Sequence, residues 1–208
     1  MQKERSLKTL PLDGGALPFH FINTVYAWKG ENLHEYLDSY KDVLEWCRKV
    51  NLLPRKVLEG LESYSRLHLE KTGEAFNKLK EIRYLLYQLF SGVAVKEIPA
   101  AVLNGYNSVL HDALLIHTWV KRKNGAVYVP SDNATELLLP VYIILKESHD
   151  LLLHEDAHRI KECPRCGWIF LDTTKNNKRR WCNPSTCGSV DKTSRYYLKI
   201  KKINNTSS

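Results

Sequence analysis

The sequence lacks the features that mark membrane proteins, secreted proteins and several enzyme classes. No apolar run approaches the ~18 residues of a membrane span. The first ten residues carry charges but no apolar core of a secretory signal. There is no internal repeat, glycine-rich phosphate loop, nucleophile elbow or paired-carboxylate motif. We therefore expect a cytoplasmic protein that is not an enzyme and does not enter a membrane.

The charges and the cysteines that are present are unevenly distributed along the 208 residues. The 50 residues from Arg159 onward contain 12 Lys/Arg and 3 Asp/Glu, a net charge of +9, whereas the other 158 carry 19 basic and 20 acidic groups. Four of the five cysteines lie between Cys163 and Cys187. With 43% apolar residues the chain can form a core. Both counts predict a domain of residues 1–158 and a second of residues 159–208.

The first 158 residues predict a mainly α domain with one β-hairpin. The hairpin signal is Asn124-Gly125, because both residues tolerate positive φ. Apolar periodicity predicts the helices. Expected features are a helix over 32–50 with an Asn32/Glu35 capping box, a helix over 55–69, a helix capped by Thr72 with Gly92 beyond its end, a helix from Pro99, and a helix over 134–158 that Pro140 either kinks or starts.

Three polar or reactive residues of this part are candidates for a functional role. Asn23 and Thr24 follow an alternating Phe19, Phe21 run and could line a ligand pocket; a satisfied hydrogen-bonding role at a strand end is the alternative. Cys47 lies on an apolar helical stripe, which indicates a buried, inert thiol.

The C-terminal cysteines are spaced like the ligands of a structural zinc site. Cys163 and Cys166 are two residues apart, Cys182 follows after 15 residues, and Cys187 after four more. Two close pairs joined by a loop can surround a tetrahedral Zn²⁺, with Pro164 and Gly167 shaping a tight knuckle. Disulfides are the rival interpretation, which the expected compartment disfavours.

The zinc module is expected to display cations. The segment 189–203 can form a helix with its cations on one face, and the loop before Cys182 adds more. Such a surface suits the phosphates of DNA; a solvated basic tail is the alternative. The candidate phosphate contacts are Lys175, Lys178, Arg179, Arg180, Lys192, Arg195, Lys199 and Lys202. We expect Trp168, Phe170 and Trp181 to pack around the metal site rather than to stack on bases.

The segment from Cys163 to Lys192 resembles the CGNR zinc finger. The matching residues are Cys163, Cys166, Gly167, Trp168, Phe170, Asp172, Thr174, Arg179, Arg180, Trp181, Cys182, Cys187, Gly188 and Lys192. Upstream, Phe21-Ile-Asn-Thr24 and Val50-Asn-Leu-Leu53 resemble the ABATE domain, the usual companion of this finger. The resemblance implies a bacterial, stress-linked transcription regulator whose finger binds DNA and whose N-terminal domain senses a ligand or partner.

One departure from the family pattern affects the expected function. Ser189-Val190 stands where the family has Asn-Arg, and Asp191 follows. If that Arg contacts phosphate in relatives, the contact is lost here. Ser189 or Asp191 could instead cap the last helix. The alternative function is a zinc-stapled module for protein or RNA contacts, without a specific DNA site.

His154-Glu-Asp-Ala-His158 matches the H-E-x-x-H pattern of metallopeptidases. On one helix the two His would face the same way, with Glu155 as base. A chance match near a helix end explains it more simply, so a metallopeptidase is only a remote alternative.

Overall fold

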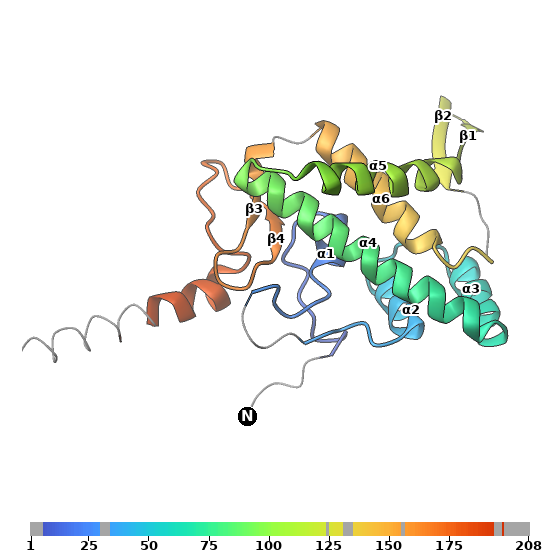
Figure 1. The fold of residues 1–208 in the computed structure, drawn as a ribbon, viewed down its shortest axis with the longest axis horizontal. Helices are drawn as coiled ribbons and strands as arrows, with labels where there is room; N and C mark the ends of the chain where they lie inside the picture. Colours follow the sequence, from blue (N-terminus) through green and yellow to red (C-terminus); the bar gives the residue numbers. More distant parts are fainter. Residues whose placement is uncertain are drawn as a thin grey trace, which may run out of the picture.

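The computed structural model describes residues 6–29, 34–123, 125–130, 135–154, 157–193 and 197. Figure 1 shows a bundle of helices with a small β-sheet and the finger at one end and a two-stranded hairpin at the other. The helices are α1 (Leu17–Ile22), α2 (Tyr40–Lys49), α3 (Arg55–Leu67), α4 (Leu69–Val95), α5 (Ala100–Leu115) and α6 (Leu139–His154). The strands are β1 (His117–Arg122), β2 (Gly125–Pro130), β3 (Ile160–Glu162) and β4 (Ile169–Leu171). Two short turns of helix are η1 (Ala157–Arg159) and η2 (Pro184–Gly188).

Helix α4 is the central element of the bundle. Its buried positions recur every three or four residues and include Leu79, Ile82, Leu86 and Leu89. This stripe packs against α1, α3 and α5, and the C-terminal end of the helix packs against β3 and β4 (Figure 1). The predicted mainly α domain with a hairpin, followed by a small finger, is therefore confirmed.

No described helix is long and apolar enough to cross a membrane.

The predicted helix over 32–50 is shorter than expected and begins at Tyr40. Ser39 caps it, because its side chain accepts a hydrogen bond from the Asp42 backbone N–H. Asn32 lies outside the described residues, and Glu35 forms an isolated antiparallel bridge with Val25 instead of closing a capping box. The Glu35 carboxylate is bound by Arg83 of α4, which holds this segment extended.

Both predicted ends of the third helix were wrong. Thr72 lies inside α4 and donates to the His68 carbonyl, because the helix already starts at Leu69. Gly92 also lies inside α4, which ends at Val95 and is followed by Lys96 in the left-handed region at φ 62°. A Cβ on Gly92 would lie 2.8 Å from the Glu97 carbonyl oxygen. Gly92 therefore permits the returning chain to pack closely rather than stopping the helix.

The remaining elements follow the predictions with small shifts. Helix α5 follows Pro99 as expected, and Pro140 marks the start of α6, which ends at His154 rather than residue 158. Strands β1 and β2 pair in antiparallel register with Arg122 opposite Gly125, so Gly125 belongs to β2. Asn124 itself lies outside the described residues.

Candidate metal centre and basic surface

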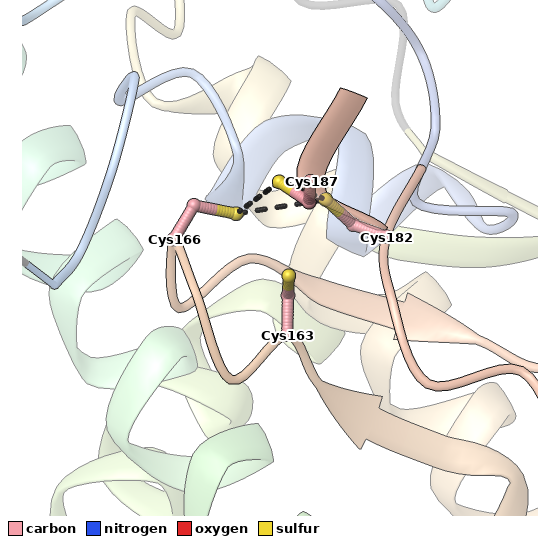
Figure 2. A group of neighbouring side chains, drawn as sticks. All are labelled: Cys163, Cys166, Cys182 and Cys187. Carbon is pink, nitrogen blue, oxygen red and sulfur yellow. Dashed lines mark hydrogen bonds between the residues drawn. The ribbon is translucent and has the colours of Figure 1, made fainter. Parts of the chain in front are cut away.

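The four C-terminal cysteines converge on one point. Their sulfur atoms all lie within 4.8 Å of one another, and no other group of three or more His, Cys, Asp or Glu in the described residues could hold a metal. Figure 2 shows Cys163 and Cys166 approaching from the β3 side, and Cys182 and Cys187 from the opposite side. Two chain segments therefore supply one pair of sulfurs each.

The spacing of these sulfurs fits a tetrahedral metal and not a disulfide. The Sγ–Sγ distances are 3.5 Å for Cys166–Cys182, 3.6 Å for Cys182–Cys187 and 3.7 Å for Cys187–Cys166. A zinc ion with Zn–S bonds of about 2.3 Å in tetrahedral geometry places its sulfurs about 3.8 Å apart, whereas a disulfide requires about 2.05 Å. The donor set therefore fits zinc, and all five cysteines are free thiols.

The knuckle that carries the first pair is built by local backbone geometry. Cys163 follows β3, and its carbonyl accepts from the Gly167 N–H at 2.9 Å. Gly167 adopts φ +77°, a conformation that favours glycine. The Cys163 N–H then donates to the Trp168 carbonyl at 2.8 Å, which starts the return along β4.

The second pair sits at a capped helical turn. Cys187 belongs to η2, and the Asn183 side chain accepts from the Ser185 and Thr186 N–H groups at 2.9 and 3.2 Å. Asn183, which sequence reasoning missed, is thus the cap that we expected of Ser189 or Asp191. The sequence did carry the signal, since Asn-Pro commonly starts a helical turn.

A buried carboxylate organises the loop between the two cysteine pairs. Asp172 is fully buried, and its oxygens accept from the Thr174 N–H, the Thr174 hydroxyl, the Lys161 ammonium and the Arg179 N–H at 2.6 to 3.0 Å. Burial alone would raise the pKa of Asp172, but these hydrogen bonds outweigh it and hold the pKa well below its ordinary value. Lys161 was missed because a lone Lys in a three-residue strand gives no signal.

Arg179 binds several groups of the finger, and its predicted phosphate contact stays a prediction. Its guanidinium donates to the carbonyls of Trp181, Cys182 and Asp13 and lies 4.7 Å from the centre of the Phe170 ring. Three of the five guanidinium N–H donors are thus engaged within the protein, which favours a structural role.

The other predicted cations remain on the surface where they are described. Lys175, Lys178, Arg180 and Lys192 are exposed, and none forms an ion pair with a described acidic residue. The Arg180 guanidinium lies 4.9 Å from the centre of the Trp181 ring. The chain is helical over residues 189–193. Arg195, Lys199 and Lys202 lie outside the described residues.

Asn23 and Thr24 are held by hydrogen bonds inside the protein, which favours the alternative of a hydrogen-bonding role; a ligand pocket at these residues stays a prediction. The Asn23 amide donates to the Ile169 carbonyl at 2.8 Å and accepts from the Ile169 N–H at 3.1 Å. Thr24 donates to the Phe21 carbonyl and accepts from Arg83 at 2.7 Å. Both are buried, at the end of α1 rather than of a strand. They are satisfied hydrogen-bonding residues, and Asn23 joins the helical domain to β4.

Aromatic residues complete the contact between finger and helices. Trp168 is buried and its Nε1 donates to the Val25 carbonyl at 2.7 Å, while Phe170 is fully buried in the core. The Cys166 carbonyl accepts from the Trp28 N–H at 2.7 Å. Trp168 and Phe170 therefore pack, as expected, and Cys47 is fully buried, as expected. Burial raises the pKa of the Cys47 thiol, consistent with an inert group.

The H-E-x-x-H pattern does not lie on one helix. Helix α6 ends at His154, His158 belongs to the separate turn η1, and both side chains are exposed. Glu155 lies outside the described residues.

Two family models match the chain, and together they cover most of it. The ABATE model, described as "Putative stress-induced transcription regulator", matches residues 15–154. The chain belongs to the ABATE family. The CGNR zinc finger model matches residues 159–199, which contain all four clustered cysteines. No curated protein matches the chain. In this ABATE protein the helices and the CGNR finger share one hydrophobic core.

Proposed function

We propose that this ABATE protein is a zinc-dependent, DNA-binding transcription regulator of the cytoplasm, whose finger contacts DNA phosphates. The observation that carries the proposal is that four cysteine sulfurs are spaced as zinc ligands, and that the chain segments next to these cysteines carry exposed cations. Lys175, Lys178 and Arg180 precede Cys182, and Lys192 follows Cys187. Cation display close to a rigid centre favours simultaneous phosphate contacts.

Cys163, Cys166, Cys182 and Cys187 would hold the metal. Zinc supplies the positive charge that lets four thiolates share a small volume, and four Cys leave no open position for substrate. The role is therefore structural. The four thiolates with Zn²⁺ add a charge of about −2, which leaves the finger strongly positive.

The helical domain is proposed to act as the sensing or interaction part, and no catalytic step is assigned to the protein. The separation of His154 and His158 onto two elements supports this choice over a metallopeptidase.

The test of DNA binding is the salt dependence of affinity, measured by fluorescence anisotropy with a labelled duplex and the zinc-loaded chain. We expect log Kd to rise linearly with log salt concentration. The variant Lys175→Gln/Lys178→Gln/Arg180→Gln should weaken binding and reduce the slope by about 2 to 3, at about 0.9 per phosphate contact.

The matched control removes the same charges elsewhere. Lys121, Arg122 and Lys123 are exposed on the hairpin, and their replacement by Gln also removes two Lys and one Arg. The control should bind DNA like the parent chain. Equal loss in both triple variants, or binding that salt does not weaken, would refute the proposed phosphate surface.

A second candidate function is a zinc-stapled module for protein or RNA contacts. Val190, at the position of the family Arg, is 43% exposed and offers an apolar surface instead of a cation. Sequencing of genomic fragments captured by the chain separates the two functions. An enriched sequence supports the regulator, and random fragments support the second candidate.

A further inference from the structure

A large cleft lies between the finger and the N-terminal segments that pack against it. Its volume is about 910 Å³. Tyr26 and Tyr36 line it on the helical-domain side, and Arg165, Arg180 and Trp181 line it on the finger side. Binding cavities for small molecules commonly enclose about 300 to 1,000 Å³ and have apolar walls with a few polar groups. The cleft therefore has the size and composition of a small-molecule site.

The metal would not fill this space. Cys166, Cys182 and Cys187 face the cleft, but a single ion among four sulfurs lies within about 2.3 Å of each. The sulfurs themselves lie within 4.8 Å of one another. A single ion among these sulfurs would therefore take up only a small part of the cleft volume.

Some charged side chains that line the cleft already bind other groups of the protein, and others do not form ion pairs with described acidic residues. Lys29 forms an ion pair with Glu162, and Asp13 accepts from the Asn183 amide at 2.9 Å. Asp191 adds a second acidic group. Arg165 and Arg180 are exposed and form no ion pair with a described acidic residue. Two guanidinium groups are thus left to receive an anion.

The aromatic walls add a preference for a flat, apolar body. Tyr36 is buried and Tyr26 is 36% exposed. One ring therefore lines the inner part of the cleft and the other lies closer to solvent. The Arg180 guanidinium lies 4.9 Å from the Trp181 ring centre, which places a cation beside an aromatic ring. Arg binds carboxylates through paired, charge-assisted hydrogen bonds, and aromatic rings pack favourably on Trp and Tyr.

We propose that this cleft binds an aromatic carboxylate, with Arg165 and Arg180 receiving the carboxylate and the Tyr and Trp rings receiving the aromatic body. Such a ligand contacts the helical domain and the finger at once. Arg180 is also one of the proposed DNA contacts. A ligand bound in the cleft should therefore weaken DNA binding. This effect on DNA rests on the proposed function, but binding of the ligand does not depend on it.

The experiment measures ligand binding to the zinc-loaded full chain without DNA, by isothermal titration calorimetry. The probes are salicylate, 1-naphthoate and indole-3-acetate, with acetate as the anion that lacks a ring. We expect saturable binding of at least one aromatic probe and at least tenfold weaker binding of acetate. The variant Arg165→Gln/Arg180→Gln should weaken the aromatic probe at least tenfold, while Lys121→Gln/Arg122→Gln should leave it unchanged.

Three outcomes would overturn the proposal: no saturable binding by any aromatic probe, acetate binding as tightly as the aromatic probes, or equal binding by the parent and the Arg165/Arg180 variant. A DNA titration with and without the bound probe then tests the coupling. Binding of the probe by a chain that does not bind DNA would refute the proposed regulator function but would support the ligand site in the cleft.

Discussion

At the residue scale, the surroundings of a cysteine decide whether it packs in the core or belongs to the proposed metal site. Cys47 is buried among apolar side chains of α2, whereas the other four point at one another. Replacing Cys163 by Ser should reduce bound zinc from about one per chain to near zero, because three thiolates form a much weaker site. Metal analysis after desalting measures this. Cys47→Ala is the control and should retain zinc; equal zinc in the parent chain and the Cys163 variant would contradict the ligand assignment.

Neighbouring cations also differ in role, and Arg179 and Lys178 make the contrast testable. Arg179→Ala removes bonds to three carbonyls and the Phe170 contact, so we expect a loss of about 2 to 3 kcal/mol in unfolding free energy. Lys178→Ala removes only an exposed side chain and should change it by less than about 0.5 kcal/mol. Denaturant unfolding of the zinc-loaded proteins measures both. Equal stability of the two variants would show that the Arg179 contacts are weak.

The same residues show which parts of the site could be predicted from the sequence. The cysteine cluster was predictable because each ligand pair is close in sequence. The role of Arg179 was not, since one of its acceptors, the Asp13 carbonyl, is 166 positions away. Asn23 is likewise 146 positions from Ile169, its partner in β4. Local patterns cannot reveal contacts between residues that only the fold brings together.

At the element scale, the knuckle and the segment around Trp28 must approach closely. A Cβ on Gly167 would lie 2.9 Å from the Trp28 Cβ, at a φ of +77° that strains other residues. Gly167→Ala should therefore cost about 1 to 3 kcal/mol. Gly73 in α4 is the control, because a Cβ there meets nothing within 4 Å, and Gly73→Ala should stabilise the helix by up to about 1 kcal/mol. Thermal unfolding distinguishes them; a tolerated Gly167→Ala would mean that the knuckle can shift.

A second element-scale link is the ion pair between Glu35 and Arg83. Arg83 is buried and donates to both Glu35 oxygens. Burial opposes ionisation of Glu35, but the hydrogen bonds and charge of Arg83 prevail and lower its pKa. Glu35→Gln should cost about 2 to 3 kcal/mol at pH 7.

The pH dependence of this difference has a definite sign. A lowered folded-state pKa stabilises the protein above the unfolded-state value of about 4.3 and ceases to do so as pH falls through the folded-state pKa. Unfolding free energies of the parent and Glu35→Gln should therefore converge below about pH 4. Thiol protonation releases metal from both proteins alike, so their difference isolates Glu35. A gap that stays constant from pH 7 to 3 would contradict the ion pair.

Helix interiors were easier to predict than helix ends for a physical reason. The apolar stripe of α4 matched its buried face, because burial follows from periodicity. The starts of α2 and α4 differ from the predictions. Glu35 binds Arg83 and the N–H groups of Tyr36 and Leu37 ahead of α2 instead of closing a capping box, and Thr72 bonds to a preceding turn. Competing partners decide a helix end, and periodicity does not reveal them.

At the scale of the whole molecule, the finger is part of the fold of the helical domain. Bonds from Asn23, Trp28, Trp168 and Arg179 cross between the two parts, and their buried residues form one core. A metal bound by the four cysteines would therefore also support the helices that pack against the finger. The cleft between the two parts is consequently a site where a bound molecule could act on both.

We propose that zinc holds the finger in the conformation that binds DNA. The most direct test of this proposal is the DNA affinity of one preparation measured as zinc-loaded, after removal of zinc by a chelator and dialysis, and after return of stoichiometric zinc. We expect salt-sensitive binding by the zinc-loaded protein, at least tenfold weaker binding without zinc, and recovery when zinc is returned. DNA affinity that is unchanged in the zinc-free protein would contradict the proposal.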